Sequence, residues 1–427
     1  MAEVSILTDD FLRELMNVGE VDILVGLPTY NDANTVGQVV QAIRAGLLKY
    51  FPRQRVVIVN VDAGSKDATQ ELVRASSISD LRHTANLNTL RTMHCISTNY
   101  SGGPSSGTAL HTIIAAADLL RASSCAVISP DSTNIEPEWM DRLLRPVVRE
   151  NIDLVTPIYC RNKFDGLLVS NLLYPMTRAL YCKRIREPRP AEYAFSGRVA
   201  SQLTGQDAWT QEVAQMGAEM YLVISAISNG FQLSQSFLGP KCRTDHAPAD
   251  LVRALRQTVG VLFWALEQNF PICNGSAETQ TAPINYDTAI NTEPLRINRK
   301  RLHQMFVRGI AELEPVLSSI LSASTLAELK NATTLSEDDF RFSDDLWVRS
   351  VYEFAAAYHK SIISRDHIVQ ALGPLYRGKA YTFLVENKDS SPEKVEKNIE
   401  ALCLNFEQSK PYLLELWNGR KEGQNVG

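Results

Sequence analysis

The sequence predicts an α/β protein with a mostly parallel sheet in the first part of the chain and an all-helical region after it. Three observations support this prediction. Short apolar runs of strand length alternate with segments of helical period up to about residue 250. Beyond that residue, long helix-period segments dominate, and no run is typical of a strand. The 427 residues, 44% hydrophobic and 21% charged, have the composition of a globular protein of two or three domains.

The first strand and helix units set the pattern. An apolar strand at 23–26 precedes a helix at 35–51, whose apolar residues recur at helical spacing. A second strand at 55–63 leads through a turn, which Ser65 and Asp67 suit, into a helix at 64–75.

Later elements follow the same alternation until the pattern changes. In order, we expect a helix at 107–122, a strand at 125–131, a helix at 136–150, a strand at 153–159, a helix at 169–181 interrupted or kinked by Pro175, a helix at 217–230 and a strand at 231–239. Four long helical stretches come next, at 249–270, 299–321, 344–361 and 393–417. We therefore predict a sheet domain at 1–250 and a helical domain at 251–427, with a polar connecting loop at 273–294.

Charge and cysteine content exclude several classes of protein. The 43 Lys and Arg against 48 Asp and Glu give a net charge of −5, which does not fit a general nucleic-acid binder. The seven cysteines are scattered without a C-x-x-C pair, which favours reduced thiols over disulfides or a zinc cluster. No apolar window reaches the roughly 20 residues that span a bilayer, and no signal peptide is evident. We expect a cytoplasmic protein without a membrane span.

Three polar motifs follow predicted strands. They span Pro28–Asp32, Asp62–Thr69 and Ser129–Asn134. In open α/β sheets, ligands bind at the carboxyl ends of the strands, where these motifs lie. A carboxylate such as Asp131 at this edge can hold a hard divalent cation against a diphosphate, and Asp62 can hydrogen-bond a ribose or a base. Each motif taken alone is also compatible with an ordinary turn or helix cap.

Together the three motifs resemble those of the GT-A fold glycosyltransferases. In that family, Pro-Thr-x-Asn-Glu/Asp and Asp-x-Gly-Ser-x-Asp-x-Thr surround the nucleotide, and a later Asp-x-Asp binds the metal. The chain looks most like the retaining, family-2-like branch of glucosyl-3-phosphoglycerate synthase and mannosylglycerate synthase. Further matches in the same order are Ser129–Pro137 with Asp-x-Asp-Leu-x-Asn-x-x-Pro, Ile185–Ala194 with Gln-Pro-Leu-Gly-Gly-Glu-Tyr-Ala, Gly217–Met220 with Gly-(Val/Ile)-(Glu/Asp)-Ile, and Lys241–His246 with the segment ending in a metal-binding His.

The resemblance implies metal-dependent transfer of a hexose from UDP-glucose or GDP-mannose, with UDP favoured, to a small hydroxy acid such as glycerate or 3-phosphoglycerate, with retention of configuration. The site residues that it implies are Pro28, Thr29, Tyr30, Asp32, Asp62 and Gly107 for the nucleotide, Asp131 and His246 for Mg²⁺ or Mn²⁺, Glu219 and Asp131 for catalysis, and Gly166, Val169, Ser170, Arg186 and Glu192 for the acceptor. The helical domain would complete the acceptor side or form the interface of a homo-oligomer.

The chain departs from the family pattern at three places. Ser129 replaces the first Asp of Asp-x-Asp, and Ser105-Ser106-Gly107 replaces a Gly-Lys-Gly segment. Leu167 replaces the Arg of an acceptor-binding Gly-Arg-Val-Thr, a loss for which Arg161, Arg184, Arg186 or Arg189 could substitute.

Two other functions are alternatives to the transferase. A catalytically silent GT-A scaffold that binds a nucleotide or a protein partner is compatible with these departures. An NAD-dependent dehydrogenase is not supported, because no G-x-G-x-x-G follows the first strand. The sequence alone leaves UDP or GDP, glucose or mannose, and the acceptor open.

Overall fold

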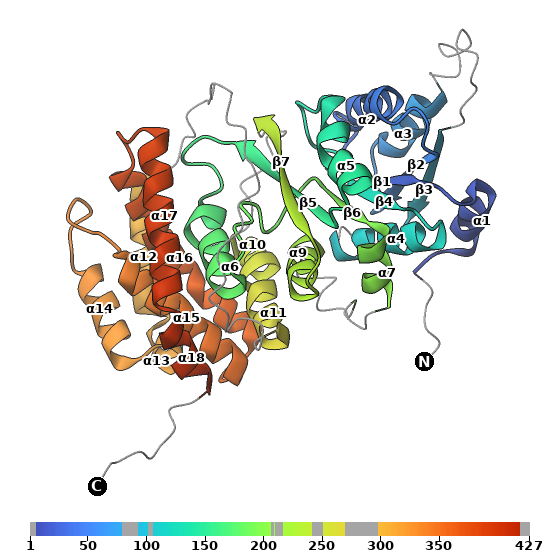
Figure 1. The fold of residues 1–427 in the computed structure, drawn as a ribbon. Coiled ribbons are helices and arrows are strands. Elements are labelled where there is room, and N and C mark those ends of the chain that lie inside the picture. Colours follow the sequence, from blue (N-terminus) through green and yellow to red (C-terminus); the bar gives the residue numbers. More distant parts are fainter. Residues whose placement is uncertain are drawn as a thin grey trace. The chain divides into compact units, whose positions relative to one another are not determined.

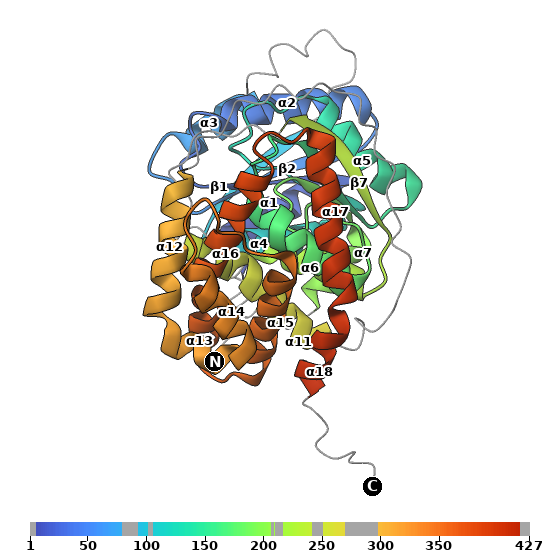
Figure 2. The same cartoon turned by 90° about the vertical axis from the view of Figure 1, so that its left-hand side faces the viewer.

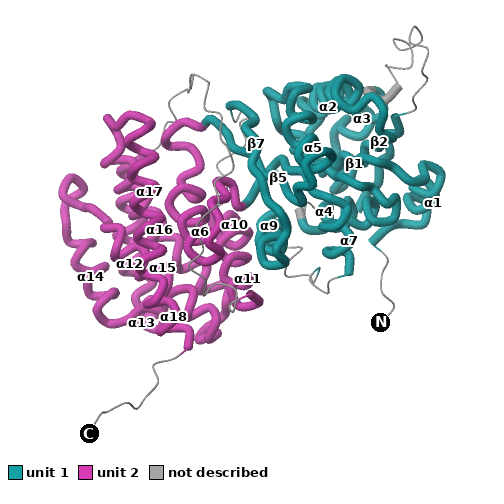
Figure 3. The backbone as a smooth tube through the Cα atoms, viewed as in Figure 1, with its two compact units in different colours: residues 1–160, 189–247, 282–289 teal, residues 161–188, 248–281, 290–427 magenta. Residues whose placement is uncertain are grey.

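The computed structural model, drawn in Figure 1, describes residues 6–78, 93–100, 106–205, 209, 217–240, 251–269 and 298–418. These residues form two compact units, shown in Figure 3. Unit 1 contains the described residues of 1–160 and 189–240, and unit 2 contains those of 161–188, 251–269 and 298–418. The segment 161–188, which lies inside the predicted sheet domain, therefore groups with the helical residues.

Unit 1 is built on a seven-stranded sheet with the order β3-β2-β1-β4-β6-β5-β7. Its strands are β1 (Ile23–Thr29), β2 (Val56–Asp62), β3 (His94–Asn99), β4 (Ser124–Val127), β5 (Leu154–Cys160), β6 (Tyr193–Ser196) and β7 (Leu233–Pro240). Within this sheet β6 runs antiparallel to β4 and β5, whereas the other paired strands are parallel. The predicted fold class, a mostly parallel sheet followed by a helical region, is confirmed.

Helices cover both faces of the sheet, as Figure 1 shows. One face carries α2 (Val36–Tyr50), α3 (Thr69–Ile78) and α5 (Glu138–Glu150), and the other carries α4 (Ser106–Leu119), α7 (Gly197–Thr204) and α9 (Ala218–Ser228). The short helix α1 (Asp9–Val18) packs near β3. Alternate residues of β1 explain the two layers: Ile23, Val25 and Leu27 lie in one core cluster with side chains of α2 and α5, and Gly26 faces Ile113 of α4.

All regular elements in the described residues of unit 2 are helices. Its elements are η3 (Val169–Leu173), α6 (Tyr174–Tyr181), α10 (Leu251–Leu255), η4 (Arg256–Gly260), α11 (Val261–Asn269), α12 (Arg299–Glu312), α13 (Glu314–Ile320), α14 (Ala323–Thr333), α15 (Asp344–Lys360), α16 (Arg365–Glu386), α17 (Pro392–Gln408) and α18 (Lys410–Asn418). The long helix α16 packs against α12 and α15, and α17 packs against α6 (Figure 2). No helix in the described part of the chain is long and apolar enough to cross a membrane.

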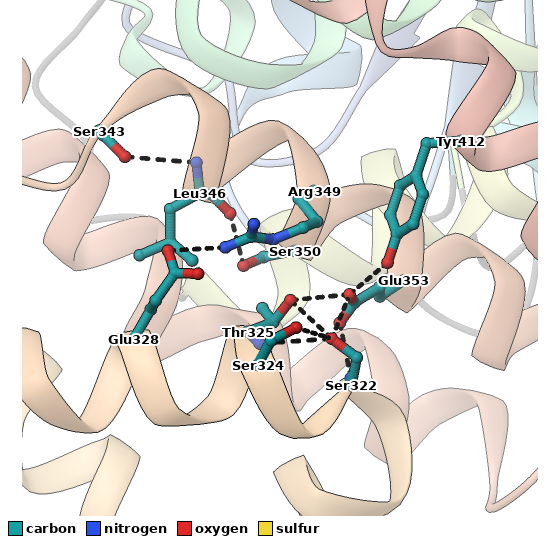
Figure 4. A network of polar contacts seen from close by, with 10 residues as sticks. All are labelled: Ser322, Ser324, Thr325, Glu328, Ser343, Leu346, Arg349, Ser350, Glu353 and Tyr412. Atoms are coloured by element: carbon teal, nitrogen blue, oxygen red, sulfur yellow. Dashed lines mark hydrogen bonds and ion pairs between the residues drawn. The ribbon is translucent and has the colours of Figure 1, made fainter.

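A hydrogen-bond network around the buried Glu353 joins three helices of unit 2. Glu353 of α15 accepts hydrogen bonds from the Ser322 amide (2.9 Å), the Thr325 hydroxyl (2.7 Å) and the Tyr412 hydroxyl (2.6 Å), as Figure 4 shows. These contacts join α15 to the first turn of α14 and to α18. Burial together with the hydrogen bond to Glu353 raises the pKa of Tyr412.

The structure differs from the predicted elements in identifiable ways. The strand expected at 125–131 ends at Val127, so that residues 128–131 are not part of the strand. The interruption or kink expected at Pro175 takes the form of a change of helix type: a π-helical turn ends at Leu173, and the proline occupies the first turn of α6.

Replacing Gly309 with alanine should destabilise unit 2. A Cβ atom on Gly309 would lie 2.3 Å from Cγ of Pro374, where α12 meets α16. The proline ring cannot rotate away, so we expect the free energy of unfolding to fall by about 1–3 kcal/mol, the usual cost of overpacking. The matched control is Gly260→Ala, because a Cβ atom there would lie an ordinary 3.8 Å from Val369 of the same α16. Urea unfolding of both variants checks this; equal midpoints for the two would contradict it.

Candidate functional site

The carboxyl edge of the unit 1 sheet has a switch in strand order. The chain passes from β1 to β2 on one side, whereas β4 pairs with the other side of β1. β1 and β4 are neighbours, so the loops that follow them both begin at this edge, where ligands usually bind in open α/β sheets. Two of the three polar motifs lie in these two loops.

A hydrogen-bonded triad joins the ends of β1 and β2. The Thr29 hydroxyl lies 2.9 Å from Oδ1 of Asn60 and 2.8 Å from Oδ2 of Asp62. All three side chains are buried, and the parallel register places Thr29 directly beside Asp62. Sequence reasoning missed Asn60, which stands between apolar neighbours in a strand and gave no motif signal.

The Asp62 carboxylate organises the loop that follows β2. Its Oδ1 accepts hydrogen bonds from the Gly64 amide (2.9 Å), the Ser65 amide (2.7 Å) and the Gln70 side chain (3.0 Å). Its Oδ2 also accepts from the Ser65 hydroxyl (2.7 Å). Asp62 is 0% exposed. The structure therefore gives this carboxylate internal partners, and a direct contact with a nucleoside stays a prediction.

The loops after β1 and β2 are also bonded to each other. The Asn31 amide donates to the Ser65 hydroxyl (2.9 Å), and Oδ1 of Asn31 accepts from the Lys66 amide (2.8 Å). Asn31 has φ 57°, a left-handed conformation that asparagine tolerates. The Asp32 amide donates to the Thr69 hydroxyl, and its carboxylate accepts from the Tyr30 amide, both at 2.8 Å. The two loops thus form one rigid surface.

The other predicted nucleotide residues occupy different environments. Pro28 is half-buried in β1, while Tyr30 is 40% exposed at the edge. Gly107 is buried in the first turn of α4, the helix that the sequence predicts from residue 107. An exposed aromatic ring beside a rigid polar loop suits stacking on a planar base.

The loop after β4 presents Asp131. This half-buried carboxylate accepts a hydrogen bond of 2.5 Å from the Ser129 hydroxyl, the residue that replaces the first acid of the family motif. The backbone of the same loop is fixed by Gln38 of α2, whose Nε2 lies 3.3 Å from the Thr133 carbonyl. Asn134 also donates to the Pro240 carbonyl at the end of β7 (2.8 Å).

Glu192 lies under the Asp131 loop. It precedes β6, whose first residue, Tyr193, pairs with Val127 at the end of β4. Its carboxylate is 0% exposed and accepts a 2.7 Å hydrogen bond from the Ser132 hydroxyl, and the Tyr159 hydroxyl of β5 donates to its other oxygen. Glu192 therefore anchors the loop that carries Asp131. Sequence reasoning gave it an acceptor role and missed Ser132 and Tyr159.

Glu219 begins α9, as the sequence predicts, and lies 17% exposed in the same unit. Its Oε2 is buried and accepts no hydrogen bond within the described part of the chain, although Nε of Arg189 is 3.8 Å away. Burial, and to a lesser degree the charge of Glu219, raise the pKa of the neighbouring Tyr193.

The remaining acceptor candidates belong to unit 2. Gly166 has φ 68°, and its carbonyl accepts a 3.0 Å hydrogen bond from the Ser170 amide, one residue after Val169. Arg186 pairs with Glu396 at 2.8 Å and lies over the Tyr174 ring. Among the described side chains, no group of three or more His, Cys, Asp or Glu could hold a metal ion. His246, the second predicted ligand, lies outside the described residues.

In unit 1, an aromatic stack joins α4 to α9. The His111 and Trp209 rings are parallel, with centroids 4.5 Å apart, and Trp209 meets the Tyr221 ring edge-on at 6.2 Å. Burial lowers the pKa of His111 to about 4, so the ring is neutral at neutral pH.

Acid should destabilise the protein through His111. The unfolded chain protonates this residue below about pH 6.5, whereas the folded chain resists until about pH 4. The contribution of neutral His111 to the free energy of unfolding is therefore fully present above pH 6.5 and is lost as the pH falls toward 4. The full shift corresponds to about 3 kcal/mol, and partial exposure of the ring reduces the expected loss to about 1–2 kcal/mol.

The variant His111→Phe tests this effect. As the pH falls from 7.5 to 4.5, the urea midpoint of His111→Phe should rise relative to that of the wild type. Phenylalanine keeps the stack but carries no charge. The exposed His367 of α16 supplies the control variant His367→Phe. A difference between His111→Phe and wild type that does not change with pH would refute the prediction.

The chain was compared with known proteins. No protein-family model matches it, and no curated protein matches its sequence. Solved structures of glucosyl-3-phosphoglycerate synthase from Mycobacterium tuberculosis match it. This enzyme belongs to the branch that the sequence motifs resemble. One, in complex with Mg²⁺ and UDP, is 21% identical, with 61% of this chain and 83% of that chain covered and a TM-score of 0.42. Another, with Mn²⁺, UDP-glucose and phosphoglyceric acid, is 20% identical, with 62% and 84% covered and a TM-score of 0.42.

Proposed function

We propose that this protein is a metal-dependent glycosyltransferase of the GT-A type, which moves a hexose from a nucleotide sugar to a small hydroxy acid such as glycerate or 3-phosphoglycerate. The observation that carries the proposal is that two polar loops follow the neighbouring strands β1 and β4 at the strand-order switch. The loop after β1, which is hydrogen-bonded to the loop after β2, contains the exposed Tyr30, and the loop after β4 contains Asp131. A base with its ribose, and a diphosphate with its cation, suit these two loops.

A divalent cation fits the donors that the site presents. Mg²⁺ and Mn²⁺ favour oxygen ligands and need only one or two protein carboxylates. Asp131 supplies a carboxylate at the sheet edge, held by Ser129 and by the anchored loop. We propose Asp131 and His246 as the protein ligands. The cation would stabilise the negative charge that develops on the diphosphate as the nucleotide leaves.

Each remaining residue has a role that its environment supports. Thr29, Asp32 and Asp62 hold the nucleotide loop in shape. We assign Pro28 and Gly107 to the nucleotide from the family resemblance. Glu219 has an unsatisfied buried oxygen, which suits a hydrogen bond from a sugar or acceptor hydroxyl or the acceptance of a proton from it.

The acceptor side and the assembly follow from the family resemblance. The resemblance implies Gly166, Val169, Ser170, Arg186 and Glu192 as acceptor residues, retention of configuration and UDP as the favoured nucleotide. We also propose a homo-oligomer formed through the helical unit. Light scattering tests the oligomer.

The experiment that tests the function is a transfer assay. UDP-glucose, UDP-galactose and GDP-mannose are each offered with D-glycerate or 3-phosphoglycerate, in Mn²⁺ or Mg²⁺ and again in chelator. We expect transfer for at least one pair and its loss in chelator. Absence of transfer and of nucleotide release in every combination would refute the proposed activity.

A silent nucleotide-binding scaffold is the second candidate. Ser129 in place of an acid, with its hydroxyl bonded to the remaining Asp131, favours it. Calorimetric titration of UDP separates the two, since a silent scaffold binds the nucleotide and turns over no donor.

A further inference from the structure

The four arginines that could replace the arginine of the family's acceptor loop have different partners. Three of them pair with carboxylates inside unit 2: Arg161 with Glu187 at 2.8 Å, Arg184 with Glu400 at 3.6 Å, and Arg186 with Glu396 at 2.8 Å. Their charges are already matched by protein groups. The position that the resemblance aligns with the family arginine is Leu167, a buried apolar residue.

Arg189 differs from these three. It belongs to unit 1, three residues before Glu192 at the carboxyl edge of the sheet. Its Nε lies 3.8 Å from Oε2 of Glu219, close enough for charge attraction but too far for a hydrogen bond. The side chain is 35% exposed, and within the described part of the chain it has no other ion pair. Its guanidinium is therefore held near Glu219 with its donors still available.

Among the described residues, Glu219 lacks a hydrogen-bond donor for one of its carboxylate oxygens. Its Oε2 is buried and accepts no hydrogen bond from any described residue. A buried charged acceptor without a partner is costly, and native structures usually satisfy it with a ligand or water. A hydroxyl group placed here would donate to this oxygen. The pair thus offers one site for an anion and one for a hydroxyl, within the span of a single small molecule.

We propose that Arg189 binds the acidic group of the acceptor while Glu219 accepts a hydrogen bond from the adjacent hydroxyl. The guanidinium fork matches a carboxylate or phosphate with two parallel hydrogen bonds. The 3.8 Å separation suits a molecule that carries its acid group next to a hydroxyl. Arg189 in this chain thus does the work that the family resemblance gives to a different position. This inference rests on the proposed transferase function for the identity of the acceptor.

The experiment compares Arg189→Gln and Arg189→Lys with the wild type. In the transfer assay, Arg189→Gln should raise KM for D-glycerate or 3-phosphoglycerate about 10- to 100-fold, the size expected for one lost bidentate ion pair. KM for the sugar donor should stay unchanged. Arg189→Lys keeps the charge but not the planar guanidinium group, so its KM for the acid should lie between those of the wild type and Arg189→Gln. The preference for D-glycerate over uncharged glycerol should shrink in Arg189→Gln, which a purely structural loss would not cause.

Arg121→Gln is the matched control. Arg121 pairs with Glu20 at the opposite, amino edge of the same sheet and is 78% exposed, so its loss should leave every constant unchanged. Binding of 3-phosphoglycerate is also followed by ligand-observed NMR without any donor. If the wild type transfers sugar and Arg189→Gln keeps the wild-type KM, the Arg189 assignment is wrong and the function stands. If the wild type transfers nothing but binds the acid in an Arg189-dependent manner, the function fails and the assignment stands. Acid binding that does not depend on Arg189, or no binding and no transfer, overturns the assignment.

Discussion

Replacing Asp131 with asparagine should lower metal-dependent sugar transfer by about 10²- to 10³-fold, the usual cost of removing one group that stabilises transition-state charge. The substitution keeps the size of the side chain and its bond to Ser129, but it removes the negative charge that holds the cation. Raising the Mn²⁺ concentration should recover part of the activity, because the variant binds the cation more weakly. Initial rates across a series of Mn²⁺ concentrations measure both effects.

The control for this variant lies at the other edge of the same sheet. Asp118 near the end of α4 accepts a hydrogen bond from Ser201, and Asp118→Asn changes the same chemical group away from the site. It should keep wild-type rates. Full activity in Asp131→Asn at low Mn²⁺ would show that the proposed metal ligand is misassigned.

Replacing Asp62 with alanine should disrupt both stability and nucleotide binding. The change leaves the Thr29 hydroxyl, the Gly64 and Ser65 amides and the Gln70 side chain without their common acceptor. Unsatisfied buried donors cost about 1–3 kcal/mol, and more where a charged acceptor is lost, so we expect the free energy of unfolding to fall by about 3 kcal/mol. The loop after β2 would also lose its shape, so UDP affinity should drop at least tenfold.

A neighbouring carboxylate of the same loop provides the comparison. Asp67 is exposed; burial opposes its charge, but hydrogen bonds from the Thr69 hydroxyl and the Ala33 amide outweigh this and lower its pKa. Asp67→Asn should cost much less stability than Asp62→Ala. Urea midpoints and UDP calorimetry on both variants check the order; an equal loss for the two would contradict the central role of Asp62.

Much of the sheet could be predicted because its strands are apolar and its helices amphipathic. β1 and β2 are buried on both faces, so their apolar runs are nearly continuous. Two strands were missed for physical reasons. β3 carries the polar sequence HCISTN, and β6 has only four residues, just after a proline-rich segment.

The helix α16 was missed because its sequence contains Gly373-Pro374, an expected helix breaker. Tertiary packing overrides that signal. Pro374 lies against α12 at Gly309, where the absence of a side chain leaves room for the ring. No local pattern in either segment reveals this distant pairing, because the two residues are far apart in the chain.

For the candidate site, the sequence predicted the positions and not the connections. Apolar runs followed by polar motifs located the ends of β1 and β2 at Thr29 and Asp62 and the loop of Asp131 after β4. That these residues bind a ligand stays a prediction. The contacts of Glu192 with Ser132 and of Glu219 with Arg189 join segments that are far apart in the chain. They depend on how β6 inserts beside β4, and β6 itself was not predicted. The hydrogen bonds of Asp62 with its own loop are local, but no motif specifies their geometry.

The most direct test of the central claim is a calorimetric titration of UDP into the wild-type protein and Asp131→Asn, each with Mn²⁺ and with chelator. The claim is that the carboxyl edge of the unit 1 sheet binds a nucleotide diphosphate through a cation held by Asp131. We predict binding to the wild type that requires Mn²⁺ and is weakened at least tenfold by chelator or by Asp131→Asn. UDP affinity that is the same in all four conditions, or no binding by the wild type, would contradict it.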